Sequence, residues 1–331
     1  MNPFFNQTII NILPYYHIIF SKRNIFIISS LAVAVFFVRS NTFVDLSSCK
    51  PRLLKQKKMQ FCYVSYVDIN GQMFLIKQKR SSRHLLCVVH DAVAAHIAES
   101  LDIAHKVDII PADMPCVGKK HQHWPATIHT LATGATIKEK RTPYKKMNIK
   151  QAMSGFRRDM LPWMAKHKDI IKIIALDIFL CNHDRHRGNL FYNAKTNSFC
   201  AIDMDLLFKF GLALYSSQNL MKMVEYDLFP ITHKEFFALV ELRDTLEFLV
   251  NTYTPEEIIT LFDNYMCKAG LIEGSPLYIS HIKSEAEGDK SMIRQNYREC
   301  KELIKTLDYV LYRAIQIKPS LGDLQVSERF V

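Results

Sequence analysis

The segment Cys181–Phe208, CNHDRHRGNLFYNAKTNSFCAIDMDLLF, decides how the rest of this chain is interpreted, because its polar side chains interrupt two apolar stretches. The apolar run Ile170–Leu180 before it predicts a buried helix that leads into the polar loop 183–189. Leu190–Tyr192 and Phe199–Ile202 predict two strands, joined by a turn rich in Asn and Lys. We therefore expect a β-hairpin that is preceded by Asn189 and followed by Asp203.

The hairpin would bring two oxygen-bearing side chains, those of Asn189 and Asp203, around one hard cation. Magnesium prefers oxygen ligands and often shares them with nucleotide phosphates. Asp184 would remain nearby to orient a hydroxyl nucleophile and accept its proton during phosphoryl transfer. The structural alternative is a polar loop whose carboxylates cap turns or pair with Arg185 and Arg187.

The same segment contains candidate ligands for two other kinds of metal site. Cys181, His183 and His186 are all potential zinc ligands, but no CxxC pair accompanies them and their spacing is not that of a zinc knuckle. Zinc is therefore not expected. A metal-dependent nuclease site built from His183, His186 and Asn189 is a more distant alternative.

The run Asp184-Arg185-His186-Arg187-Gly188-Asn189, followed by Ala201-Ile202-Asp203, resembles the catalytic and metal-binding segments of atypical kinases. The families concerned are HipA-like protein kinases, type II phosphatidylinositol 4-kinases and bacterial (Legionella-type) effector kinases. The resemblance implies ATP as the phosphoryl donor, Asp184 as the catalytic Asp, and Asn189 and Asp203 as ligands of Mg²⁺ or Mn²⁺. Asp205 is a weaker candidate for assisting them.

Upstream, two predicted strands, Gln60–Ile69 and Met73–Gln78, flank Asn70-Gly71, a strong signal for a two-residue hairpin turn. Lys77 lies on the second strand, where its ammonium could reach nucleotide phosphates. Lys79 shares its face and is the rival, and an exposed strand lysine is the structural alternative. The resemblance favours Lys77, because HipA-like kinases carry their phosphate-binding lysine just after such a hairpin.

The segment His84–Leu101 is predicted to be a helix, and Asp91 and Glu99 are its candidates for pairing with Lys77. Asp91 matches the position of the helix acid in related kinases, although those usually carry the longer Glu. Asp91 as a plain surface carboxylate is the alternative.

A glycine-rich Gly-x-Gly-x-x-Gly loop is missing, since Gly71 stands alone in this region. Any phosphate cradle is expected from the Asn70-Gly71 turn, from Arg80–Ser82 or from another loop. Val107–Pro111 and Ala126–Leu131 predict further strands, and Ala132–Gly134 would then occupy the hinge that reads the adenine edge.

Composition bounds the partners and the compartment. The chain has 331 residues, 49% of them hydrophobic, and a formal charge of +11, which favours anionic partners. Eight scattered cysteines without a framework of short spacings indicate reduced thiols and a cytoplasmic protein. The basic stretch Lys138–Lys150 is either a solvated connection or a surface for an acidic substrate, an inositol polyphosphate or an anionic membrane. Nucleic acid is not expected, because aromatic residues are not interleaved with the basic ones.

The first 58 residues differ from the rest. Ile25–Val38 is strongly apolar and follows Lys22-Arg23, an order typical of a signal or anchor segment. Residues 9–38 could therefore associate with a membrane, whereas a reading frame that truly starts at Met59 is the alternative. Lys50–Lys58 is expected to be a solvated basic linker.

After the hairpin, the chain is expected to be mostly helical. Thr232 and Thr254 both begin capping-box patterns, and residues between Ile293 and Leu311 repeat at helical spacing. We expect the flexible break of this region at Gly274–Gly288.

These observations predict an α+β, two-lobed, protein-kinase-like fold. Residues 59–136 would form a small antiparallel β-rich N-lobe, and residues 137–331 a helical C-lobe containing the catalytic hairpin 183–205. The expected activity is that of an atypical protein Ser/Thr kinase, in the manner of a secreted bacterial effector. The alternatives are a phosphoinositide kinase and a non-catalytic module that binds nucleotide or anionic lipid.

Overall fold

The structure is a computed structural model that describes residues 17–21, 24–28, 46, 51–132, 135–136, 156, 158–208, 211–225 and 231–321. The chain divides into two units, Met1–Ser47 and Ser48–Val331. In the first unit, strands β1 (His17–Ser21) and β2 (Asn24–Ile28) form an antiparallel pair. Residues 29–38 of the expected anchor lie outside the described part of the chain. Among the described residues, no helix has the length and apolar character needed to cross a bilayer.

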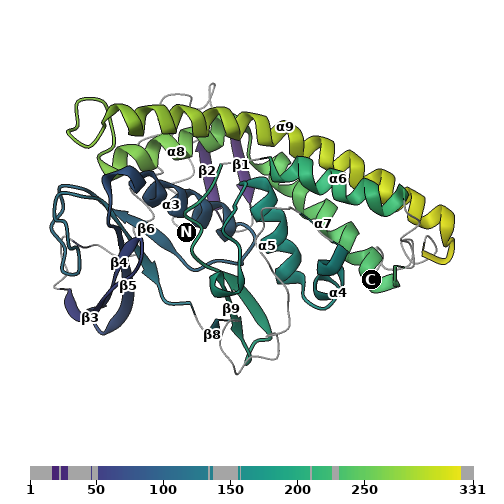
Figure 1. The fold of residues 1–331 in the computed structure, drawn as a ribbon, viewed down its shortest axis with the longest axis horizontal. Coiled ribbons are helices and arrows are strands. Elements are labelled where there is room, and N and C mark those ends of the chain that lie inside the picture. The colour runs from purple at the N-terminus through teal and green to yellow at the C-terminus, as the bar shows by residue number, and fades with distance from the viewer. Residues whose placement is uncertain are drawn as a thin grey trace, which may run out of the picture. The chain divides into compact units, whose positions relative to one another are not determined.

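The second unit begins with a five-stranded antiparallel sheet (Figure 1). Its strand order is β3-β4-β5-β7-β6, with bounds Arg52–Lys58, Cys62–Ile69, Gln72–Lys79, Ala126–Thr130 and Val107–Ile110. The turn between β4 and β5 has positive φ at Asn70 (54°) and Gly71 (83°), as the predicted hairpin requires. The central strand β5, which carries Lys77, is thereby paired on both edges.

The expectation of a solvated linker at Lys50–Lys58 is wrong. Arg52–Lys58 forms β3, an edge strand that pairs with β4 along its whole length. All its residues are exposed, and an exposed basic strand has the same composition as an unstructured basic segment. Lysine-rich edge strands are common because the charges discourage pairing with a second sheet.

Helix α3 (Leu86–Glu99) covers the sheet and is buried along nearly its entire length. It contacts β5, β6 and β7 on one side and the C-terminal helix α8 on the other. A helix that is enclosed from both sides needs apolar residues around its whole circumference, which explains the mixed periodicity of its sequence. Two polar residues in it, His90 and Asp91, are each only 1% exposed.

The rest of the described part of this unit consists of helices and connecting loops, apart from a small three-stranded sheet (Figure 1). This sheet joins β8 (Ala135–Thr136), β9 (Leu190–Asn193) and β10 (Ser198–Ala201). The helices are α4 (Leu161–Met164), α5 (Lys168–Phe179), α6 (Leu212–Glu225), α7 (His233–Thr252), α8 (Pro255–Ala269) and α9 (Ser280–Ile317). The two-lobed α+β arrangement predicted from the sequence is confirmed: an antiparallel sheet with one helix, followed by a helical part that contains the β9–β10 hairpin.

The long helix α9 corrects a second expectation. Gly288 was placed in a flexible break, but it lies within α9, which continues without interruption from Ser280 to Ile317. A glycine in a helix interior costs roughly 1 kcal/mol relative to alanine, a penalty that packing elsewhere along the helix can outweigh. The expected apolar stripe does face the core, with Ile293, Cys300 and Leu307 nearly inaccessible to solvent.

The capping box at the start of α8 gives a prediction about stability. The Thr254 side chain accepts a hydrogen bond from the Glu257 amide, and the Glu257 carboxylate accepts one from the Thr254 amide (2.8 Å). Replacing Thr254→Ala should lower the free energy of unfolding by about 1 kcal/mol, because the Glu257 amide at the helix start loses its acceptor. Urea unfolding would measure this loss.

The control is Thr260→Ala on the exposed side of the same helix, where the hydroxyl only donates to the Glu256 carbonyl within the helix. That variant should unfold at the parent urea concentration. Equal losses in the two variants would contradict the capping role.

Candidate active site

The centre of the candidate site is the Lys77 ammonium, which meets three carboxylates from two other parts of the chain. It forms an ion pair with Asp203, lies 2.9 Å from the Asp205 carboxylate and 3.6 Å from that of Asp91. Asp91 comes from α3, whereas Asp203 and Asp205 follow β10. The structure therefore brings Lys77, Asp91 and Asp203, three residues singled out in the sequence, to one point.

The register of β5 explains this convergence. Lys77 and Lys79 are two residues apart on a strand and so project from the same face. Both side chains are about 10% exposed or less, and Lys79 forms an ion pair with Asp205. The rival lysine thus occupies a neighbouring position in the same cluster, while Lys77 makes the contacts to Asp91 and Asp203.

The charged forms of Lys77, Lys79 and Asp205 stabilise one another. Burial alone would lower the pKa of Lys77, but Asp205, Asp91 and Asp203 outweigh it and raise that pKa well above the usual range. Burial would likewise raise the pKa of Asp205, yet Lys77 and Lys79 hold it well below the ordinary value. The site therefore presents fixed ammonium and carboxylate groups in a setting with little water.

Asp91 is a buried connector rather than a surface carboxylate. Besides its approach to Lys77, its carboxylate accepts a hydrogen bond from the backbone amide of Met204 (3.2 Å). Its position inside the sheet–helix interface lets this short side chain approach Lys77. Asp91 thereby ties α3 to the segment that carries Asp203.

The end of the β9–β10 hairpin sets the positions of Asn189 and Asp203. The amide of Ile202 donates to the Asn189 carbonyl (3.2 Å), so the two ends of the hairpin lie side by side. Asp203 adopts a left-handed conformation with φ 56°, which is unfavourable for a residue with a side chain. Strain of this kind, of order 1–3 kcal/mol, persists where the surroundings determine the backbone, and here both flanking residues are held.

Asp184 and Asn189 lie in direct contact within the loop before β9. The Asn189 side-chain amide donates to the Asp184 carbonyl (2.8 Å) and to its carboxylate (3.1 Å). The Asp184 side chain is 35% exposed, so it is open to an incoming hydroxyl. Burial raises the pKa of Asp184, while His186 acts in the opposite direction. A carboxylate with a raised pKa is a better proton acceptor than an ordinary one.

The loop is held from behind by Arg185 and by Asp177, a buried residue of α5 that the sequence-based prediction omits. Arg185 is 3% exposed and forms a bidentate pair with Asp177 at 2.8 and 3.0 Å. Its remaining nitrogen donates to the carbonyls of Asn189 and Ile202. Asp177 also accepts a hydrogen bond from Asn182. The sequence signal that could have identified Asp177 is its place as the single acid in the apolar run Ile170–Leu180, because a buried acid needs a partner.

The donor set fits a divalent cation that also binds phosphate. Asn189 uses its amide nitrogen on Asp184, which leaves its oxygen as the group able to bind a cation, and Asp203 has the most exposed carboxylate of the Lys77 cluster, at 38%. In the described part of the chain, no three residues among His, Cys, Asp and Glu are grouped to hold a metal by themselves. Two protein oxygens completed by phosphate and water suit Mg²⁺ or Mn²⁺ and do not suit structural zinc.

The two loops expected to cradle phosphate lie differently with respect to Lys77. The Asn70-Gly71 turn closes one end of the β4–β5 hairpin. Lys79 lies at the other end, where it pairs with Cys62 at the start of β4. Arg80 donates to the carbonyls of Met59 and Gln60 (2.9 and 2.8 Å). The turn 59–61 between β3 and β4 therefore lies at the end of the sheet that carries Lys79. The sequence did not predict this turn, because β3 was not predicted to be a strand.

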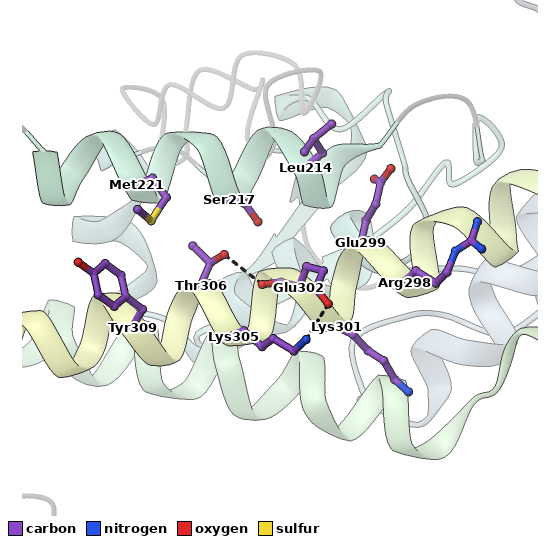
Figure 2. Close-up of a pocket in the computed structure, with 10 residues that line it drawn as sticks. All are labelled: Leu214, Ser217, Met221, Arg298, Glu299, Lys301, Glu302, Lys305, Thr306 and Tyr309. Atoms are coloured by element: carbon purple, nitrogen blue, oxygen red, sulfur yellow. Dashed lines mark hydrogen bonds and ion pairs between the residues drawn. The ribbon is translucent and has the colours of Figure 1, made fainter.

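Other expectations have a simpler outcome. The strand expected at Ala126–Leu131 is β7, in which Thr127 and His129 are buried and joined by a side-chain hydrogen bond of 2.7 Å. Gly134 of the expected hinge and the basic stretch Lys138–Lys150 lie outside the described residues. A surface groove of 780 Å³ between α6 and α9 contains none of the site residues (Figure 2).

Comparison with known proteins gives similarity only at the level of structure. No protein-family model matches the chain, and no curated protein matches it. Similar solved structures include the Helicobacter pylori proinflammatory kinase CtkA, at 14% identity and a TM-score of 0.44, covering 82% of this chain and 98% of that one. Another is a Ralstonia eutropha protein described as a putative aminoglycoside phosphotransferase, at 10% identity and a TM-score of 0.31, covering 83% and 98%. Both scores are below 0.5, so the interpretation below rests on the geometry of the site.

The Arg185–Asp177 pair leads to a prediction. Asp177→Ala should lower the free energy of unfolding by about 3–5 kcal/mol, because it leaves a buried guanidinium without its carboxylate. The loss would be measured as a lower midpoint of urea unfolding.

Lys305→Ala is the comparison, since it removes an exposed ion pair with Glu302 in which both side chains are about two-thirds exposed. Its effect should stay below about 1 kcal/mol. A small effect of Asp177→Ala would show that the pair does not hold the loop.

Proposed function

We propose that this chain is an ATP-dependent phosphotransferase that transfers the γ-phosphoryl group to a hydroxyl acceptor. The observation that carries this proposal is the convergence of Lys77, Asp91 and Asp203 from a strand, a helix and a post-hairpin segment. An isolated polar loop would not gather charges from parts of the chain more than a hundred residues apart. The contact between Asp184 and Asn189 in the same loop system adds a proton acceptor.

Each residue has a distinct part in the proposed reaction. Lys77, released from Asp203 by competition, binds phosphate oxygens of ATP, and Asp91 keeps its ammonium in place. Asn189 and Asp203 would hold Mg²⁺ or Mn²⁺, which supplies neutralisation of phosphate charge when bound. Asp184 orients the acceptor hydroxyl and takes its proton as the oxygen bonds to the γ-phosphorus, and ADP leaves with the electrons of the broken bond.

We propose a protein Ser or Thr hydroxyl as the acceptor, following the resemblance of the segment 184–203 to atypical protein kinases. The same resemblance supports a role as a bacterial effector acting in a cytosol. The net charge of +11 is compatible with an acidic partner or an inositol polyphosphate activator. Phosphoinositide phosphorylation is the alternative outcome of the acceptor test, and binding without transfer is the other.

The test uses the full chain with γ-labelled ATP and Mg²⁺ or Mn²⁺, offered generic protein, phosphoinositide vesicles and no added acceptor, with and without inositol hexakisphosphate. Asp184→Asn should reduce transfer by about 100-fold to 10,000-fold, because it removes the proton acceptor while retaining shape. Asp203→Asn should reduce transfer and weaken Mn²⁺-dependent nucleotide binding. Label on protein supports the proposed acceptor, and label on lipid alone overturns it.

The matched control is Asp113→Asn, a carboxylate in an exposed loop position. It should leave both transfer and nucleotide binding at the parent level. Nucleotide binding without transfer under every condition would contradict the enzyme and favour a binding module.

A further inference from the structure

A buried histidine that the proposed reaction does not use contacts the same segment as the Lys77 cluster. The His90 ring on α3 lies 3.2 Å through Nδ1 from the backbone carbonyl of Asp205 and 2.8 Å through Nε2 from the carboxylate of Asp289 on α9. His90 is 1% exposed and Asp289 3% exposed. The rings of Phe208 and Phe262 lie 5.6 and 6.1 Å from the His90 ring, which encloses it in apolar surroundings.

Both ring nitrogens of His90 have a hydrogen-bond partner. A backbone carbonyl oxygen accepts only, so Nδ1 donates to Asp205, while Nε2 shares a hydrogen bond with the Asp289 carboxyl group. His90 and Asp289 therefore form a buried polar pair, and such a pair contributes little net stability compared with apolar residues of similar size.

The position of this pair indicates what it does. Asp205 is held through its carboxylate by Lys77 and Lys79 and through its carbonyl by His90, while the next amide upstream, that of Met204, is held by Asp91. Side chains from β5 and α3 thus fix the segment 203–205. His90, the α3 residue that contacts the Asp205 carbonyl, is itself held by Asp289 of α9.

Helix α9 also holds the other half of the site. Asn296, seven residues after Asp289 and on the same face, donates to the carbonyls of Ile178 and Phe179 at 3.0 and 2.5 Å. These carbonyls belong to the last turn of α5, which leads into the loop of Asp184. One helix face therefore contacts the supports of both the proton acceptor and the cation ligand.

We propose that His90 and Asp289 are positioning residues that hold the segment 203–205 and so couple α9 to the geometry of the active site. The proposal deepens the proposed phosphotransferase function and rests on it for its kinetic consequence. Its structural consequence, the ordering of residues 203–205, holds without any nucleotide.

The decisive variant is the double replacement His90→Phe/Asp289→Leu. Each single replacement removes one side of the His90–Asp289 hydrogen bond and keeps the other polar side chain buried, which risks unfolding, whereas the double replacement substitutes apolar residues of similar size for both. The variant should melt within a few degrees of the parent. Amide hydrogen exchange of a peptide covering 201–208, measured without ligand, should accelerate about 10-fold or more, because the Asp205 carbonyl has lost its donor.

The kinetic readout is ATP affinity and kcat/KM in the presence of Mg²⁺. Loss of residues that position ligand-bearing segments typically costs about 10–100-fold, and this range is expected for the double variant. Asp289→Asn is the conservative variant: its amide can donate to a neutral Nε2 and keep Nδ1–H directed at the carbonyl. The Asp289→Asn variant should show amide hydrogen exchange of residues 201–208 and a kcat/KM close to those of the parent.

The control is Asp263→Asn/Lys290→Met, which removes the adjacent α8–α9 ion pair of 2.9 Å in a more exposed setting. It should change neither exchange at 201–208 nor kinetics. A folded His90→Phe/Asp289→Leu variant with parent exchange would overturn the proposal. If the parent chain transfers no phosphoryl group, the proposed function fails, and the exchange comparison still decides whether His90 and Asp289 hold the segment.

Discussion

The charge cluster of Lys77 with Asp91, Asp203 and Asp205 is the constraint on which the arrangement of the site depends. It joins the central strand of the antiparallel sheet to the segment after the β9–β10 hairpin, and so connects the two lobes at one point. Charges removed from water must be paired, or their burial costs several kcal/mol each. The sheet, α3 and the hairpin can therefore adopt few relative positions, since Asp91 and Asp205 must reach the same ammonium.

A second layer of polar contacts keeps these charges in register. Arg185 and Asp177 fix the loop of Asp184 from inside, while Asn296 holds the end of α5 that leads into it. Buried networks of this kind are costly when incomplete and strongly orienting when complete. The proposed phosphoryl transfer would depend on positioning more than on covalent chemistry. It would need such a framework, because small displacements of the proposed proton acceptor or cation ligand would lower the rate.

Two features of the site differ from what the resemblance to atypical kinases implies, and the structure gives a physical account of each. The helix acid is Asp91 instead of Glu, and its place within a closely packed sheet–helix interface brings it to 3.6 Å from Lys77. The glycine-rich loop is missing, and the turn at the lysine end of the sheet, residues 59–61, is short and bound to Arg80. Two lysines on one strand face place a second positive charge beside the cluster.

The sequence by itself determined the elements whose signals are local. The hairpin around Asn70-Gly71, the strands flanking residues 193–198 and the capping boxes at Thr232 and Thr254 follow from turn geometry and from side chains that bond neighbouring amides. Local patterns also placed Lys77, Asp184 and Asp203 on the correct elements. Only the tertiary structure decided that β3 is a strand, that Asp91 is buried, and that Asp177, His90 and Asp289 support the site. Those features depend on partners distant in the chain, because pairing and burial arise only when separate segments pack together.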